Sequence, residues 1–157
     1  MDTSSWPTDD WKAFFVRWEK EQYHQGNLDL IDEYNSPDLV DHHLPPGYDD
    51  GNEGKRRLVR ELLDDFPDFR LRMDDLVVER IGDGDVHFKV VEQFTISGTH
   101  HGTYRGIQPT GEAFETSGIA MMRLIDGIEF EHWAVVDDLD MPTQRGVFES
   151  PLPKGSS

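Results

Sequence analysis

The chain changes its hydrophobic period once, and this change limits the folds that it can adopt. Before Pro67, large apolar residues recur every three to four positions, most clearly at Trp11, Phe14, Phe15 and Trp18. After Pro67 the period becomes two, which is typical of strands that bury one face. Helices followed by consecutive strands predict an α+β fold and argue against a parallel sheet built from βαβ units.

Local signals divide the first part into helices and one short strand. The first helix starts near Thr8, a favourable N-cap, and ends at Gly26. A short second helix ends before Ser36-Pro37, and a third covers residues 55–65. Between them, residues 39–43 are predicted to form a strand.

The second part reads as a series of strands joined by tight turns. We predict strands over residues 69–78, 86–96, 113–124 and 128–137, with hairpin turns at Gly82-Asp83-Gly84 and Asp126-Gly127, and then a brief helix. A length of 157 residues fits one domain spanning 1–157, with loose tails at about 1–8 and 147–157.

The charge of the chain excludes several partners. The net charge is −17, from 32 acidic and 15 basic residues, so phosphate backbones and anionic lipids are repelled, and we expect no nucleic-acid or membrane partner. A source adapted to high salt and an ordinary acidic protein both fit this charge. Without cysteine there is no disulfide, thiolate zinc site or cysteine nucleophile. Because no segment looks like a signal peptide or membrane span, we expect a cytoplasmic protein.

Several sequence blocks occur together in a recognisable order. They are Gln25-Gly26-Asn27-Leu28-Asp29, Ser36-Pro37-Asp38-Leu39-Val40-Asp41-His42, Gly98-Thr99-His100, Gly106-Ile107-Gln108-Pro109-Thr110-Gly111 and Glu131-His132-Trp133. Over about residues 10–145 this order resembles the SnoaL-like polyketide cyclases and related ester cyclases of the nuclear transport factor 2-like (NTF2-like) superfamily. The resemblance implies a cone-shaped α+β barrel, in which a curved antiparallel sheet wraps around N-terminal helices and encloses an apolar pocket.

The resemblance also implies a chemistry, a cofactor-independent aldol ring closure in which an acidic residue on the last strand removes a proton next to a carbonyl. Asp137 matches that residue by its position in the motif. Strand alternation places Asp137 on one face with Trp133 and places His132 and Asp138 on the other. Apolar surroundings would raise the pKa of Asp137 toward that of a useful base. Alternatively, Asp137 or Asp138 caps the brief helix that follows.

The remaining site candidates are histidines and aromatic residues. His42 and His100 can donate a hydrogen bond to a developing enolate oxygen, although they are as easily explained as solvated or structural histidines. The predicted pocket walls are Trp133, Tyr34, Trp18 and Phe15, the last two with a core role as the commoner alternative. No spacing in the sequence resembles a set of metal ligands, so neither a metal nor a cofactor is expected.

Three functions remain open at this point. The first is acid/base catalysis, an aldol cyclisation or an isomerisation, on a small apolar carbonyl compound. The second is a non-catalytic module that binds a small apolar ligand, because one fold often hosts unrelated functions. The third is epoxide hydrolysis, for which Arg105 and Arg123 are available without a diagnostic spacing. By analogy with related folds, we expect a homodimer.

Overall fold

The computed structural model describes residues 3, 5–81 and 87–137 of the chain. In chain order the elements are α1 (Thr8–Glu19), the π-helical turn η1 (Lys20–His24), α2 (Leu30–Tyr34), β1 (Asn35–Asp41), α3 (Gly51–Asp65), β2 (Arg70–Ile81), β3 (His87–Thr99), β4 (Ala113–Ile125) and β5 (Ile128–Val136). The turn predicted at 82–84, the helix predicted after residue 137 and the tail predicted at 147–157 lie outside the described residues.

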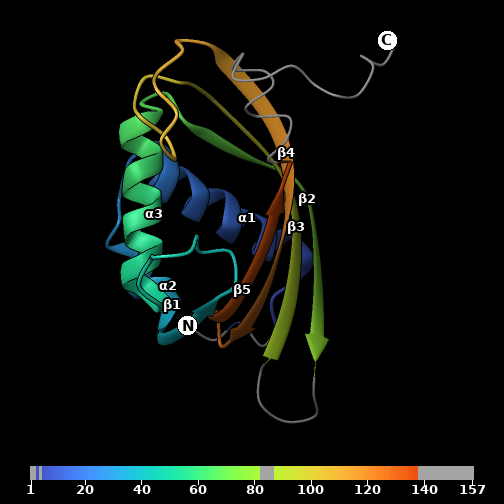
Figure 1. The fold of residues 1–157 in the computed structure, drawn as a ribbon. Helices are drawn as coiled ribbons and strands as arrows, with labels where there is room; N and C mark the ends of the chain where they lie inside the picture. The colour runs from blue at the N-terminus through green and yellow to red at the C-terminus, as the bar shows by residue number, and fades with distance from the viewer. Residues whose placement is uncertain (1–2, 4, 82–86, 138–157) are drawn as a thin grey trace.

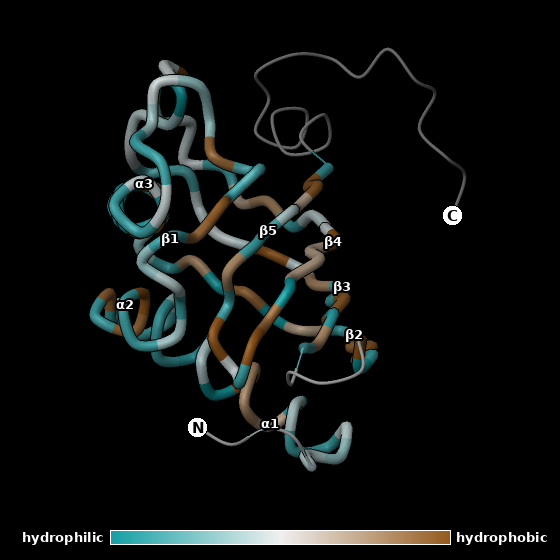
Figure 2. The backbone as a smooth tube through the Cα atoms, turned by 90° about the horizontal axis from the view of Figure 1, so that it is seen from below, coloured by the Kyte–Doolittle hydropathy of each residue, from teal (hydrophilic) through white to brown (hydrophobic). Residues whose placement is uncertain are grey.

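One five-stranded sheet, in the order β1-β5-β4-β3-β2, forms the body of the molecule. Strands β2 to β5 pair as an antiparallel meander, whereas β1 runs parallel to β5 at one edge. The sheet curves, and α1 and α3 lie on its concave side (Figure 1). Hydrophobic and hydrophilic residues alternate along the strands (Figure 2). The predicted α+β class, a curved sheet with the N-terminal helices packed on it, is confirmed.

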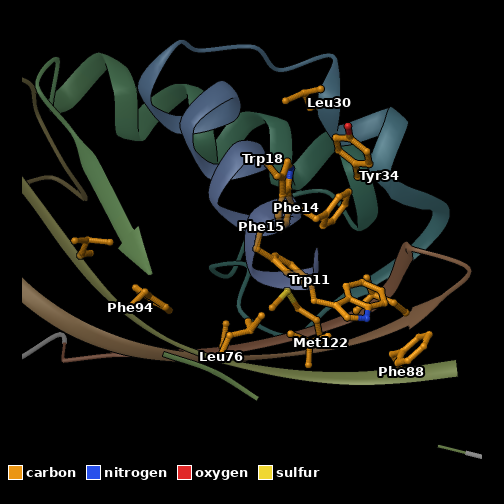
Figure 3. Close-up of a cluster of buried hydrophobic side chains, with 14 of the residues drawn as sticks. Trp11, Phe14, Phe15, Trp18, Leu30, Tyr34, Leu76, Phe88, Phe94 and Met122 are labelled. Carbon is orange, nitrogen blue, oxygen red and sulfur yellow. The ribbon is translucent and has the colours of Figure 1, made fainter. Parts of the chain in front are cut away.

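The concave side holds an aromatic core supplied largely by α1 (Figure 3). Trp11 is almost fully buried and packs against Phe88 of β3, with 4.8 Å between the ring centroids. Phe15 stacks on Trp11 and meets Trp18 edge to face. Aromatic side chains bury large apolar areas at few positions, which allows a chain with only 36% hydrophobic residues to form a core.

The N-terminal segment expected to be loose is packed where it is described. Trp6 meets the ring of Trp11 edge to face, with centroids 5.1 Å apart, and Thr3 is fully buried. The side chain of Thr3 lies beside Gly127, in the turn between β4 and β5. Aromatic contact with α1 therefore holds this segment against the body of the protein.

The β4–β5 hairpin determines which residues of β5 face the interior. Asp126 and Gly127 have φ values of 51° and 81°, as expected for the predicted Asp-Gly turn. Beyond the turn, Leu124 pairs with Glu129 but Arg123 pairs with Glu131, so one residue of β5 is bulged out of the register. Without the bulge, Glu129 and His132 would lie on opposite faces of β5, because they are three residues apart. The bulge shifts the alternation by one residue, so that both side chains face inward.

A close backbone approach in the middle of the sheet requires glycine at position 118. A methyl group there would lie 2.4 Å from Cζ of Phe94 and 2.9 Å from the carbonyl oxygen of Val135. We predict that Gly118→Ala lowers the free energy of unfolding by about 1–3 kcal/mol in urea titrations, because the ring and a strand must both shift. The exposed neighbour Ser117 serves as control, and Ser117→Ala should stay within about 0.5 kcal/mol of wild type. An equal loss in the two variants would contradict the steric argument.

Candidate active site

A cavity of about 110 Å³ lies on the concave side of the sheet, beneath α1, η1 and α3. Apolar side chains from the helices and from β2 to β5 make up most of its wall, including Leu58, Leu62, Phe69, Phe94, Ile96 and Met122. The polar side chains in the wall are Glu19, Tyr23, His43, Lys55, Glu92 and His132. An apolar enclosure with a few convergent polar groups is the usual form of a small-molecule site.

A buried ion pair orients one of these groups. Lys55 of α3 donates a hydrogen bond from Nζ to Oε2 of Glu129 at 2.9 Å, and both side chains are less than 5% exposed. The other oxygen of Glu129 lies 2.6 Å from Nδ1 of His132. Burial alone would raise the pKa of Glu129, but the charge of Lys55 and the contacts with His132 outweigh it and lower this pKa to about 2.

The ionised Glu129 fixes the tautomer of His132. A carboxylate can only accept hydrogen bonds, so Nδ1 of His132 must be the donor in this pair. In the neutral ring Nε2 is then an acceptor, and His132 is part of the cavity wall. A histidine held in this way can take a proton from a ligand while the carboxylate stabilises the resulting imidazolium.

Two further buried carboxyl groups contact each other in the cavity wall. Glu19 of α1 and Glu92 of β3 are each 5% exposed and hydrogen-bond to one another. Burial raises the pKa of both groups, and the neighbouring carboxylate of Glu19 raises that of Glu92 further, far above its usual range. At neutral pH Glu92 is therefore a carboxylic acid, able to donate a hydrogen bond.

Tyr23 and His43 complete the polar part of the wall. Burial, together with the charge of Glu129, raises the pKa of Tyr23, so its hydroxyl remains a donor. Burial and the nearby His132 lower the pKa of His43, whose Nδ1 lies 3.2 Å from the carbonyl oxygen of Ala134. The cavity thus combines neutral donors with two histidines, and in each neutral ring Nδ1 donates within the protein and Nε2 is left as an acceptor.

The predicted catalytic residues Asp137 and His42 lie on the other side of the sheet. Asp137 is exposed beyond the end of β5, beside a shallow depression that Val135 also lines, and its N–H donates to the carbonyl of Ser117 at 3.1 Å. His42 stacks on Trp133 at 4.8 Å between centroids. Asp137 and Trp133 do fall on one face, as strand alternation predicts, but that face is the outer one. Asp138 lies outside the described residues.

His100, the third predicted catalytic residue, is fully buried away from the cavity. Its ring stacks on Phe66 at 5.6 Å, and Nδ1 accepts a hydrogen bond from the N–H of Thr110 at 3.3 Å. These contacts hold the segment between β3 and β4. The structure therefore does not bring Asp137, His42 and His100 together.

Of the four predicted wall residues, Trp18 lines the cavity. Phe15 packs in the aromatic core instead. Tyr34 contacts Phe14 and accepts a hydrogen bond from Arg17 at 3.0 Å. Trp133 lies on the outer face, where it stacks on His42.

Sequence reasoning missed the carboxyl groups of the cavity, although one of them left a signal. Glu92 interrupts the apolar alternation of β3, between Val90 and Phe94, at a position that must face the interior. A carboxyl group there is costly unless it is paired or functional, so it marks a candidate site. Glu129 gave no comparable signal, because the bulge that turns it inward depends on strand pairing.

A meander wrapped around helices, with an apolar cavity on its concave side, defines an NTF2-like α+β protein. The chain belongs to the SnoaL-like polyketide cyclase family, whose sequence model matches residues 13–145. No sequence among proteins of curated function matches it.

Solved structures of similar fold include proteins from three Streptomyces species. TsrD from Streptomyces laurentii is 27% identical with a TM-score of 0.77, over 92% of this chain and 100% of TsrD. IdmH from Streptomyces antibioticus, assigned as a polyketide cyclase, is 29% identical with a TM-score of 0.66, over 85% of this chain and 97% of IdmH. AclR from Streptomyces galilaeus, assigned as a hydroxylase, is 24% identical with a TM-score of 0.72, over 94% of this chain and 91% of AclR, and supports the fold alone.

Within 5–81 and 87–137, no three His, Asp or Glu side chains converge in a way that could hold a metal ion. No helix in the same ranges has the length and hydrophobicity needed to span a membrane.

The raised pKa of Glu92 gives a testable dependence of stability on pH. The folded protein keeps a proton on Glu92 that the unfolded chain releases above its ordinary pKa of 4.5, so stability falls as the pH rises above that value. We predict that Glu92→Gln, which keeps a donor toward Glu19, raises the free energy of unfolding by roughly 1–3 kcal/mol at pH 8 and has little effect near pH 4.5. Denaturant titrations at both pH values, with exposed Glu79→Gln as control, would measure this. An equal effect at both pH values would contradict a titrating Glu92.

Proposed function

We propose that this protein is a cofactor-independent acid/base enzyme that removes a proton next to a carbonyl group of a small apolar compound and either closes a ring by aldol addition or isomerises the compound. The observation that carries the proposal is His132, held by ionised Glu129 at 2.6 Å in the wall of an apolar cavity. Its free nitrogen, Nε2, is the proposed base. Membership of the SnoaL-like polyketide cyclase family supports the class of reaction.

The rest of the cavity suits the charge that such a reaction creates. When Nε2 of His132 takes the α-proton, negative charge develops on the carbonyl oxygen. The hydroxyl of Tyr23 can donate a hydrogen bond to that oxygen, whereas the proton of Glu92 is already donated to Glu19. The enolate carbon then bonds to a second carbonyl carbon, and the imidazolium returns its proton to the new alkoxide. The proton count closes without a cofactor.

The structure favours catalysis over the two alternative functions. A simple ligand-binding module needs the apolar wall but not a buried Lys55–Glu129–His132 chain, which is costly to desolvate. For epoxide hydrolysis, the candidate Arg123 faces outward and pairs with Glu131 at 3.0 Å. Arg105 lies in the segment between β3 and β4 and is not part of the cavity wall.

Proton abstraction can be tested with a small ketone, phenylacetone, whose exchange of benzylic protons in D₂O is followed by NMR. We predict that His132→Gln slows the catalysed exchange about 100-fold or more, because it removes the proposed base. Glu129→Gln should slow the exchange about tenfold or more, because it removes the carboxylate that fixes the tautomer of His132. Circular dichroism would confirm that each variant is folded.

Matched variants on the outer face, Asp137→Asn and His42→Asn, should exchange at the wild-type rate. Loss of exchange in Asp137→Asn, with His132→Gln still active, would instead identify Asp137 as the base. Binding of phenylacetone without catalysed exchange by the wild-type protein would favour the ligand-binding module.

We also propose a cytoplasmic homodimer formed through the outer face of the sheet. Strand register places Val77, Val91, Met121 and Trp133 side by side across β2 to β5. In an adjacent row Ile119 pairs with Val135, and these two residues are 56% and 75% exposed. An apolar band of this extent is typical of a protein–protein contact, and a second copy would cover it by two-fold symmetry.

The proposed interface predicts the effect of one added charge. The wild-type protein should elute at twice the chain mass of 18.1 kDa, measured by light scattering coupled to size exclusion. Val135→Lys should shift it to the monomer, because two lysines would meet across the two-fold axis. The control Val16→Lys, at a position of α1 that is 50% exposed, should remain dimeric. A monomeric wild-type protein, or a dimeric Val135→Lys, would refute this interface.

A further inference from the structure

A groove lies next to the cavity, and two side chains belong to the walls of both. This groove of about 420 Å³ runs between the end of α1, η1, the first half of β2 and the neighbouring ends of β3 and β4. Glu19 and Leu71 line both the groove and the cavity. The groove is therefore adjacent to the cavity.

The groove gathers positive charge in a strongly acidic protein. Lys20, Arg70 and Arg72 line it, whereas the chain as a whole carries 32 acidic and 15 basic residues. A local concentration of cations against this background would attract an anion and hold it. The acidic residues of its wall are Glu19 of α1 and Glu115 of β4.

Two of these cations have no carboxylate partner in the described part of the chain. Arg70 donates from its guanidinium group to the backbone carbonyl of Phe69 at 2.6 Å and retains further N–H donors. Lys20 makes no ion pair with a described residue, whereas Arg72 pairs with Asp74 at 2.8 Å. Lys20 and Arg70 are therefore available to bind an anion from outside.

The sizes of the two hollows indicate what occupies each. A cavity of about 150 Å³ is known to hold one benzene molecule, so the 110 Å³ cavity holds roughly one small ring. A substrate with two reacting carbonyl groups is larger than this and must extend outside the cavity. Past Glu19 and Leu71, the extension would meet Lys20 and Arg70.

We propose that the groove binds an anionic group of the substrate, a carboxylate or a phosphate, while the apolar carbonyl part occupies the cavity. This inference names the substrate class of the proposed enzyme and so rests on that function. Arg70 would bind the anion through paired N–H donors, and Lys20 would add a second charge-assisted hydrogen bond. Specificity for an anionic ketone would then arise outside the reacting centre.

Binding of isosteric probes tests the groove without requiring turnover. The probes are 3-phenylpropionate, its neutral amide 3-phenylpropionamide, and phenethyl phosphate, each titrated by calorimetry at fixed ionic strength. We expect the wild-type protein to bind the carboxylate about tenfold more tightly than the amide. Tighter binding of the phosphate ester than of the carboxylate would support the site and identify a phosphate as its ligand. Displacement of the carboxylate probe by inorganic phosphate alone would indicate that the groove binds a free anion.

Variants that remove charged side chains test whether the preference for the carboxylate over the amide comes from the groove. The double variant Lys20→Gln/Arg70→Gln should bind acid and amide equally, and the control pair Arg80→Gln/Lys89→Gln, outside the groove, should keep the tenfold preference. Glu115→Gln should increase it. His132→Gln should also keep it, so a failed catalytic proposal and a failed groove would be distinguishable. Equal binding of acid and amide by the wild-type protein, or a preference that survives Lys20→Gln/Arg70→Gln, would overturn the inference.

Discussion

The interior of this protein depends on the ion pair between Lys55 and Glu129. A carboxylate buried to this degree is tolerated only with a partner close by, and Lys55 provides it at 2.9 Å from the facing helix. The contact joins α3 to β5 and keeps Glu129 ionised. Ionised Glu129 in turn fixes the tautomer of His132 at the cavity wall. One buried charge pair thus links the packing of a helix on the sheet to the proposed chemistry.

The two faces of the sheet differ in what they present. The inner face supplies Glu92 and His132 to the cavity, and the outer face presents an apolar band that includes Trp133. Holding Glu92 as a neutral acid lowers stability at neutral pH, a cost typical of functional sites. Glu19 stands where the cavity and the basic groove meet, so the same side chain contributes to both proposed parts of the substrate site.

Much of the fold could be predicted from local patterns. The switch from a helical period to a period of two gave the α+β class, and Asp126-Gly127 identified a hairpin turn that the structure contains. The residues of the candidate site were harder to predict from sequence. Alternation correctly grouped Asp137 with Trp133, but it cannot tell which face of a strand is buried when both faces carry aromatic or aliphatic residues. Glu92 was detectable as a carboxyl group in an apolar strand.

By itself the sequence determined the order and type of the elements and the family, because hydrophobic period, turn residues and motif order are local properties of the chain. The tertiary structure alone decided which residues share the cavity. Lys55 and Glu129 are 74 positions apart, and Glu129 faces inward because of a bulge set by pairing with β4. The shifted pKa values follow from the same cause, since burial and charge proximity exist only after distant segments have packed together.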